Sequence, residues 1–184
     1  MSLLKLEHSK AWYFADFVIY ILAIVVGAAL MVVFTPRTQW LNSALFFVCG
    51  LIGWSLVEYL LHRFILHGLQ PFSRWHAEHH DRPRAYIVTP TFFSAAMIAA
   101  FIYLPAFGMF GLWCSAALTL GMVTGYLGFT WIHHALHHWR ADSTWLKNRK
   151  RLHAIHHQNA KSGHYGVTTS FWDVVFRTRG MRDA

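Results

Sequence analysis

The sequence predicts an all-α integral membrane protein with four transmembrane helices, arranged as two hairpins, and a helical cap on the cytoplasmic side. Composition is the first observation: 55% of the 184 residues are hydrophobic and 17% are aromatic, more than a soluble domain usually carries. The second is a set of four nearly uncharged stretches of about 18 to 25 residues, the length that crosses a hydrocarbon core. They cover residues 17–34, 40–61, 88–107 and 108–132.

Short turns separate the members of each pair. Residues 35–39 (TPRTQ) and 104–108 (LPAFG) contain the Pro and Gly residues that break helices. Neither turn is long enough to hold a domain. In the last stretch, Gly121 and Gly125 have the spacing of small residues at a close contact between membrane helices.

The positive charges lie almost entirely on one side of the expected membrane. With four crossings, 15 of the 16 Lys and Arg residues share the side that carries both termini, and only Arg37 lies on the other. This asymmetry places the termini in the cytoplasm, and we expect a bacterial inner membrane rather than the endoplasmic reticulum. It also accounts for the net charge of +8 without nucleic acid, for which no binding motif is present. The first apolar stretch is long enough to stay in the membrane, so we expect no cleaved signal peptide.

Histidines are concentrated on the two segments that this topology leaves in the cytoplasm. All but one of the 14 lie there, mostly in four clusters: HRFILH (62–67), HAEHH (76–80), HHALHH (133–138) and HAIHH (153–157). In the second and fourth clusters the spacing i, i+3, i+4 puts three imidazoles on one helix face. His62 and His67, five residues apart, can face one centre only at a kink or a helix end.

These clusters indicate a metal site in the cap. Neutral imidazole is a common metal ligand, and crowded imidazoles repel one another when protonated. Eleven clustered histidines, with His134 set aside, exceed the four ligands of one zinc ion but suit two metals of about five ligands each. The sequence therefore predicts a dimetal site, although spacing alone does not choose between His133 and His134. His8 and His164 are expected to be ordinary hydrogen-bonded residues.

In order, spacing and topology, the four clusters resemble the histidine pattern of the membrane fatty acid hydroxylase / sterol desaturase superfamily. The segment HYGVTTSFWDVVFRT (164–178) is similar to the GVTS..WD.VFGT ending of its fatty acid 2-hydroxylase branch, although Arg177 stands where the family commonly has Gly. The resemblance covers about residues 50–178 and implies one membrane domain over residues 1–184. Its HxxxHH pattern matches His133, His137 and His138. The metal ligands that it implies are His62, His67, His76, His79, His80, His133, His137, His138, His153, His156 and His157.

The resemblance implies a di-iron lipid hydroxylase that uses O2, most directly on a fatty acyl chain at carbon 2, as in free fatty acids or sphingolipid-type acyl groups. An unactivated hydrocarbon offers side chains no acid, base or leaving group, so a cofactor must supply the reactivity. Zinc is an alternative metal in the purified protein. The HPGG motif of a fused cytochrome b5 domain does not occur in the sequence, so we expect a separate electron donor of the ferredoxin or cytochrome b5 type. The basic run at Lys147, Arg149, Lys150 and Arg151 either faces solvent or lipid head groups, or docks this donor.

Neutral ligands leave the metal charge uncompensated, so we predict nearby carboxylates that orient imidazole N–H groups. The candidates are Glu58, Asp173, Glu78 and Asp81, each with a solvated acid or an Arg partner as the alternative. Tyr126 and Trp131 are candidates for lining a substrate tunnel, with core packing or lipid contact as the alternative.

Two other functions fit parts of the pattern. Carotenoid and sterol hydroxylases or desaturases of the same superfamily share the histidine boxes. A histidine-rich metal transporter should carry ionisable residues deep within its spans, whereas only Asp16 and Glu58 come close, both near the ends of apolar stretches.

Overall fold

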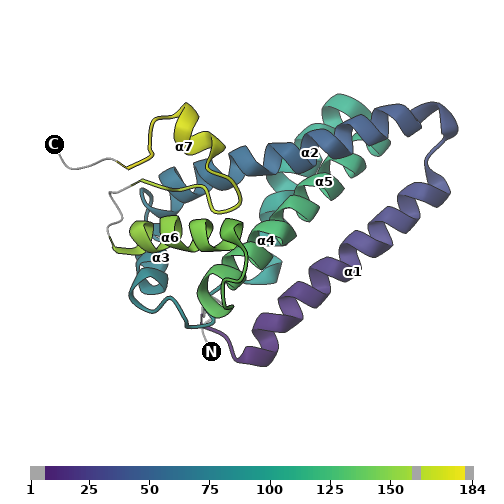
Figure 1. Cartoon of the computed structure of the whole chain (residues 1–184). Coiled ribbons are helices and arrows are strands. Elements are labelled where there is room, and N and C mark those ends of the chain that lie inside the picture. The colour runs from purple at the N-terminus through teal and green to yellow at the C-terminus, as the bar shows by residue number, and fades with distance from the viewer. Residues whose placement is uncertain (1–6, 159–162, 181–184) are drawn as a thin grey trace. The chain divides into compact units, whose positions relative to one another are not determined.

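The computed structural model describes residues 7–158 and 163–180 and consists of helices joined by short connections (Figure 1). Within these residues there is no β-strand, only isolated bridges, so the all-α prediction is confirmed. A 3-10 turn, η1 (Arg37–Gln39), and two π-helical segments, η2 (Leu61–Leu66) and η3 (Ala99–Tyr103), interrupt or join the α-helices. The α-helices are α1 (Lys10–Phe34), α2 (Trp40–Leu60), α3 (Phe72–Asp81), α4 (Thr91–Ile98), α5 (Leu104–His138), α6 (Thr144–Gln158) and α7 (Phe171–Val175).

The chain forms two compact units. One, here named the membrane unit, consists of Met1–Trp54 and Tyr86–Leu127. The other, named the histidine unit, consists of Ser55–Ala85 and Gly128–Ala184. Each unit therefore combines two segments that are distant in the sequence.

Among the residues that the structure describes, three helical runs are long and apolar enough to cross a membrane: Lys10–Phe34, Arg37–Leu66 and Thr91–His138. We expected a turn between two spans at residues 104–108, because of Pro105 and Gly108. The helical run instead continues through Pro105, directly after the π-helical segment η3, and leaves helical geometry at Gly111, where φ is 74° and ψ is −177°. Glycine accepts this positive φ because it has no Cβ.

The run Thr91–His138 folds back on itself at this point. On α1, the hydroxyl of Tyr20 lies 2.7 Å from Ser94 Oγ, and the Tyr20 ring lies 4.9 Å from the ring of Tyr126. In a single straight helix, residues 94 and 126 would be about 48 Å apart at 1.5 Å per residue. The two arms on either side of Gly111 therefore lie side by side against α1.

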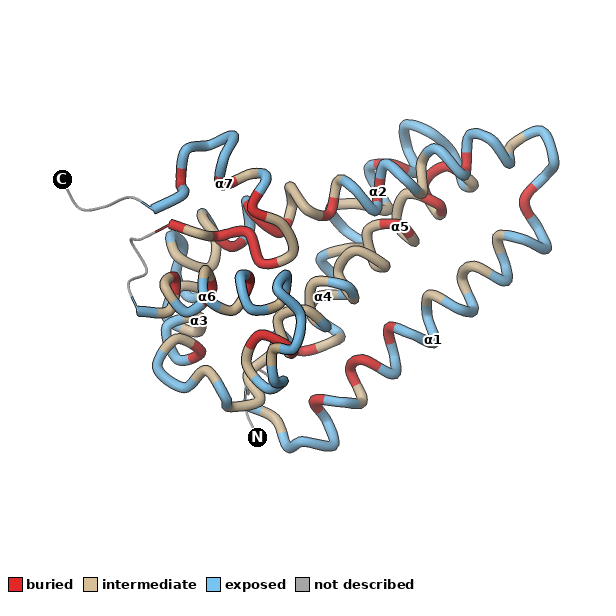
Figure 2. The backbone as a smooth tube through the Cα atoms, in the orientation of Figure 1, coloured by how far each residue is buried: buried red, intermediate tan, exposed pale blue. Residues whose placement is uncertain are grey.

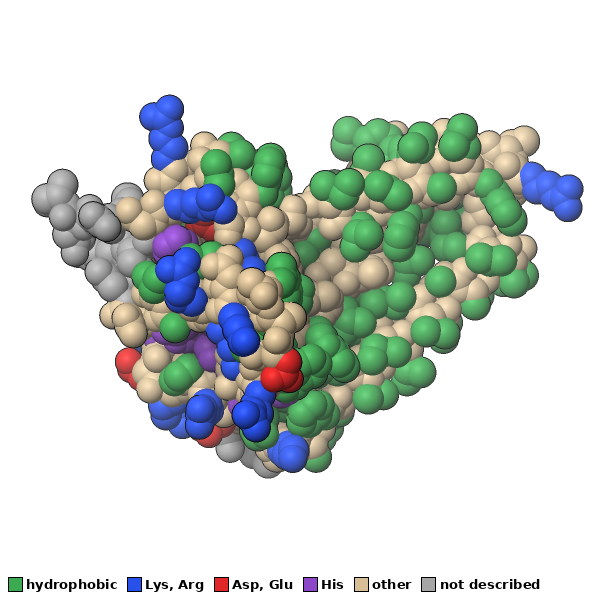
Figure 3. Space-filling view, viewed as in Figure 1, with side chains coloured by type: hydrophobic (Ala, Val, Ile, Leu, Met, Phe, Trp, Pro, Cys, Tyr) green, Lys and Arg blue, Asp and Glu red, His purple; other side chains and the backbone are tan. Residues whose placement is uncertain are grey.

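Helices α2 and α5 pack backbone to backbone in the membrane unit. A Cβ added to Gly50 would lie 2.2 Å from the carbonyl oxygen of Leu118, and one added to Gly121 would lie 2.1 Å from that of Phe47. The expected close contact at Gly121 is thus present. Large apolar side chains point away from the unit, with Leu22 57% exposed and Val33 71% exposed, and they cover the visible faces of α1 and α2 (Figure 3). Such a surface is suited to lipid rather than water.

The histidine unit has a polar core. Its fully buried side chains include Tyr59, His156 and Asp173, and Glu58 and Arg149 are also buried. In Figure 2 much of this burial falls on the segment that precedes α7. Because buried polar groups must be hydrogen-bonded to be stable, this unit is held together by a specific network of donors and acceptors.

Candidate metal centre

Ten imidazoles of the histidine unit gather into two groups of five, and within each group the candidate ligand atoms all lie within 4.8 Å of one another. The first cluster comes from η2 and its end, α3 and α6. The second comes from α3, α5 and α6. The first cluster comprises His62, His67, His76, His80 and His156, and the second comprises His79, His133, His137, His153 and His157.

Each i, i+3, i+4 trio is divided between the two clusters. Helix α3 directs His76 and His80 to the first cluster and His79 to the second. Neighbouring positions on a helix differ by about 100° in direction, so His79 and His80 point at different centres. Helix α6 divides its trio in the opposite sense, with only His156 in the first cluster. Both helices therefore serve both centres.

The π-helical segment η2 brings His62 and His67 to one centre. A π-helical turn contains more residues than an α-helical turn, so residues five apart come closer in direction than they would on an α-helix. The two ring centroids are 5.1 Å apart. This segment supplies the departure from ideal helix geometry that their spacing required.

On α5 the structure brings His133 and His137 into the second cluster and leaves His134 and His138 outside both. The Nε2 atom of His133 lies 3.1 Å from those of His79 and His137. The rings of His134 and His138 stack on each other with centroids 4.5 Å apart. Of the eleven histidines predicted as ligands, His138 is thus the one that does not join a cluster.

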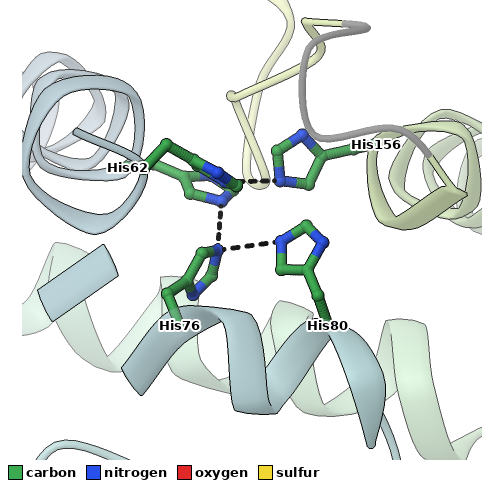
Figure 4. A group of neighbouring side chains, drawn as sticks. His62, His76, His80 and His156 are labelled. Carbon is green, nitrogen blue, oxygen red and sulfur yellow. Dashed lines mark hydrogen bonds between the residues drawn. The ribbon is translucent and has the colours of Figure 1, made fainter. Parts of the chain in front are cut away.

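The nitrogen positions fit metal ions better than they fit hydrogen bonds between the rings. In the first cluster, His76 Nε2 lies 3.0 Å from His62 Nε2 and 3.1 Å from His80 Nε2 (Figure 4). A neutral imidazole nitrogen carries at most one hydrogen or one lone pair, and His62 Nδ1 already donates to the carbonyl of Tyr165 over 2.6 Å. Its Nε2 therefore has only a lone pair, and His76 cannot both donate to it and accept from His80. Two nitrogens bound at right angles to one metal at about 2.1 Å would be about 3.0 Å apart.

The same spacing recurs elsewhere in the site. His67 and His156 have Nε2 atoms 3.0 Å apart, and His137 and His153 have theirs 2.9 Å apart. Both ring nitrogens of His157 are buried without a hydrogen-bond partner. A bound cation would satisfy one nitrogen of each of these rings.

Burial and the neighbouring imidazoles keep the clustered rings neutral. Burial, followed by repulsion from the other imidazoles, lowers the pKa of His67 to about 4 and the pKa of His79 to about 2. The pKa values of His156 and His157 are each lowered to about 3, again mainly by burial. At neutral pH these rings therefore present lone pairs, the form that binds metal.

The predicted carboxylates Glu58 and Asp173 are buried, but the groups that they bind are not imidazoles. Glu58 accepts from the backbone N–H groups of Val167 (2.6 Å) and Thr168 (2.9 Å). Asp173 accepts from those of Tyr165 (2.9 Å) and Gly166 (3.0 Å). Both carboxylates thus hold the loop that precedes α7, and it is this loop that contacts the histidines. Backbone carbonyls carry no sequence signal of their own, so this link could not be read from residue types.

The other candidate residues lie in less specific surroundings. Glu78 and Asp81 are on the exposed side of α3. Tyr126 packs between aromatic rings in the membrane unit, and Trp131 is 48% exposed and lies edge-on to another tryptophan ring. Neither residue lines the two apolar grooves found beside α1, so their role in a tunnel stays a prediction. Arg149, which the sequence placed in an exposed basic run, is buried.

Comparison with known proteins agrees with this geometry. A family model described as fatty acid hydroxylase matches residues 47–178. The chain is 31% identical over 144 residues to a dihydroceramide fatty acyl 2-hydroxylase of Arabidopsis thaliana, covering 70% of this chain and 58% of that protein. It is 30% identical over 148 residues to a ceramide very long chain fatty acid hydroxylase of Schizosaccharomyces pombe, covering 73% of this chain and 42% of that protein.

A fatty acid 2-hydroxylase of Rattus norvegicus is 30% identical over 144 residues, which cover 72% of this chain and 38% of that protein. The chain thus spans about 38% to 58% of the length of these relatives. Among solved structures, full-length scs7p, in which only the hydroxylase domain is visible, superimposes with a TM-score of 0.81 at 25% identity. This match covers 97% of this chain and 69% of that one.

Proposed function

The chain belongs to the fatty acid hydroxylase family, and from that premise we propose that it is a membrane-bound, O2-dependent hydroxylase of fatty acyl chains, acting at carbon 2. The observation that carries the proposal is the pair of five-histidine clusters. Ten neutral imidazoles in two groups suit two iron ions, because imidazole is a ligand that iron accepts. When bound, the two ions would supply the O2 activation and electron transfer that no side chain can provide.

The protein's own contribution is to hold the ligands and shape the site. We propose that the ten clustered histidines are the metal ligands and that His134 and His138 are not. The polar core of the histidine unit fixes the rings, since a ligand imidazole is oriented by the hydrogen bond that its other nitrogen makes. His62 and His156 donate from Nδ1 to the carbonyls of Tyr165 and Gly163, over 2.6 and 2.9 Å. Their Nε2 lone pairs are thereby directed into the first cluster.

The substrate class is proposed from the relatives. The three relatives are named as a dihydroceramide fatty acyl 2-hydroxylase, a ceramide very long chain fatty acid hydroxylase and a fatty acid 2-hydroxylase. The segment before and within α7 has the sequence similarity to 2-hydroxylases noted above. Hydroxylation replaces one C–H bond by C–OH, and the second oxygen atom of O2 leaves as water after two electrons and two protons are taken up.

We propose that the chain crosses the membrane four times, with the histidines on the cytoplasmic side. The fold-back at Gly111 divides the run Thr91–His138 into arms of about 21 and 27 residues, and each arm is long enough to span a hydrocarbon core of about 30 Å at 1.5 Å per residue. The distribution of Lys and Arg supports the proposed orientation. Of the membranes with a cytoplasmic face, a bacterial inner membrane is the one proposed.

We propose that a separate protein delivers the electrons. Lys147 and Arg151 are exposed on α6, the helix that carries three of the clustered histidines. Positive side chains at this position would favour an acidic protein of the ferredoxin or cytochrome b5 type. The buried Arg149 takes no part in this surface.

Lipid analysis of an expressing host tests the function. Membranes are extracted from cells that make the wild-type chain or the His79→Ala variant, and acyl chains are analysed by mass spectrometry after hydrolysis. Carotenoids and sterols from the same extracts are analysed in parallel. We expect 2-hydroxylated acyl chains only with the wild type, whereas hydroxylated carotenoids or sterols without hydroxylated acyl chains would reject the proposed substrate class.

A further inference from the structure

We propose that the segment of residues 163–170, here named the tail loop, orients the ligands of the first cluster selectively, with Glu58, Asp173 and Arg149 as its positioning residues. One of the two metals would then depend on the tail loop far more than the other. This inference rests on the two-metal assignment in the proposed function. It concerns how the site is built and does not depend on the substrate.

Two buried carboxylates fix the backbone of the tail loop. Glu58, 3% exposed, accepts three hydrogen bonds, from Val167 N, Thr168 N and Thr168 Oγ1. Asp173, 0% exposed, also accepts three, from Tyr165 N, Gly166 N and Thr178 Oγ1. A buried carboxylate is costly unless it is fully hydrogen-bonded. Satisfying both therefore requires the loop to keep this one conformation.

Arg149 holds the carbonyl side of the same loop. Its guanidinium donates to the carbonyl oxygens of Gly166 and Val167 and to Ser170 Oγ. The two carboxyl groups thus bind N–H groups, and the guanidinium binds carbonyl groups, of the same short segment of backbone. Gly166 lies at the centre of this arrangement, because a Cβ there would lie 2.9 Å from Asp173 Oδ2 and 2.0 Å from Thr169 O.

Two carbonyl groups of the tail loop accept hydrogen bonds from imidazoles of the clusters. Tyr165 O accepts from His62 Nδ1, and Gly163 O accepts from His156 Nδ1. Gly163 has φ 79° and pairs with Arg179, while the N–H of His164 donates to Thr178 O over 3.1 Å. Backbone pairing between the segments before and after α7 therefore fixes the positions of these two carbonyl groups.

Both of these imidazoles belong to the first cluster. In the second cluster, by contrast, His79 Nδ1 is buried without a hydrogen-bond partner. Two of its members, His133 and His137, are positioned by α5, a helix distant in sequence from the tail loop. The contacts that orient ligands are thus distributed unequally between the two centres.

Metal counting with three variants tests the inference. In Asp173→Asn, the amide NH2 must face the N–H of either Tyr165 or Gly166, whichever way it is turned, so one bond becomes a repulsion. Glu58→Ala removes all three acceptor bonds. In Glu58→Gln, by contrast, Oε1 still accepts from both N–H groups, and the NH2 can donate to Thr168 Oγ1. Each purified full-length variant is loaded with Fe(II), washed by buffer exchange and analysed for iron per chain, with the exposed Asp142→Asn as the charge-matched control.

We expect two iron ions per chain in the wild type, Glu58→Gln and Asp142→Asn, and one in Glu58→Ala and Asp173→Asn. The inference would be overturned if Glu58→Ala and Asp173→Asn lost both ions equally or kept both. It would also be overturned if the wild type held fewer than two ions. If these variants fail to fold, Thr168→Val removes only one bond to Glu58. It should weaken one of the two Fe(II) binding steps by up to about tenfold, the lower end of the effect of losing a partner that bonds a ligand directly, and leave the other unchanged. An unequal metal count in a protein that does not hydroxylate acyl chains would reject the proposed substrate and leave this inference standing.

Discussion

The Nδ1 atom of His62 lies 2.6 Å from the carbonyl oxygen of Tyr165, a residue 103 positions later in the chain. This contact decides which nitrogen of His62 carries the hydrogen, since a carbonyl can only accept. It therefore leaves a lone pair on Nε2, the nitrogen that faces the other imidazoles of the first cluster. The chemistry of one ring is thus set by a backbone group near the other end of the protein.

Changing Gly166 to Ala should disrupt the tail loop directly. The added Cβ would lie 2.0 Å from Thr169 O, a distance that requires the backbone to shift. We expect the free energy of unfolding to fall by about 2 to 3 kcal/mol, the upper part of the range found for overpacked sites, together with the loss of one iron ion per chain. Urea unfolding in detergent and metal analysis measure the two effects. Gly128→Ala on α5 is the matched control, because a Cβ there meets nothing within 4 Å; a Gly166→Ala variant as stable as this control would contradict the tail-loop geometry.

The histidines of α5 should separate sharply in their effects on metal content. His137 belongs to the second cluster, whereas His134 and His138 stack on each other outside both clusters. His137→Ala should therefore lose at least one iron ion per chain and most hydroxylation activity. His134→Ala and His138→Ala should keep two ions, as counted by elemental analysis of the purified protein. Loss of iron in His138→Ala would instead support the prediction that His138 is a ligand.

Replacing Gly121 by Leu should separate α2 from α5 in the membrane unit. Even a Cβ at this position would lie 2.1 Å from the carbonyl oxygen of Phe47, and close backbone approach is a main source of stability between membrane helices. We expect a loss of about 3 kcal/mol, the upper part of the range for overpacking, measured as helix content during unfolding in SDS. Gly108→Ala, where a Cβ has nothing within 4 Å, should behave as the wild type. Equal stability of the two variants would mean that the helices are not in backbone contact.

The sequence was informative where a local pattern determines the structure. The all-α fold and the apolar runs follow from composition and length, and the clustering of His76, His79 and His80 follows from helical spacing. Local spacing does not reveal how the trio divides. Whether His79 joins His76 or His133 depends on where α3 lies relative to α5 and α6, which is a matter of tertiary packing.

Three predictions failed or stayed open for similar reasons. The sequence alone does not show whether His133 or His134 joins the cluster. Only the rotation of α5 about its axis distinguishes them. Glu58 was predicted to bind imidazole N–H groups, but one of its oxygen atoms accepts from the backbone N–H groups of residues 167 and 168. No residue pattern predicts such backbone contacts. Arg149 sits in a run of exposed cations, and only the buried loop carbonyls explain why it points inward.

Helix α5 continues from an apolar run into His133 and His137 with no interruption after Gly111. Inserting one residue between Gly111 and His133 would rotate both imidazoles by about 100° and advance them by about 1.5 Å. The rotation would turn both imidazoles away from the direction in which they now point. The part of α5 that follows Gly111 can therefore keep these two imidazoles in their present direction only if its length changes in steps close to whole helical turns.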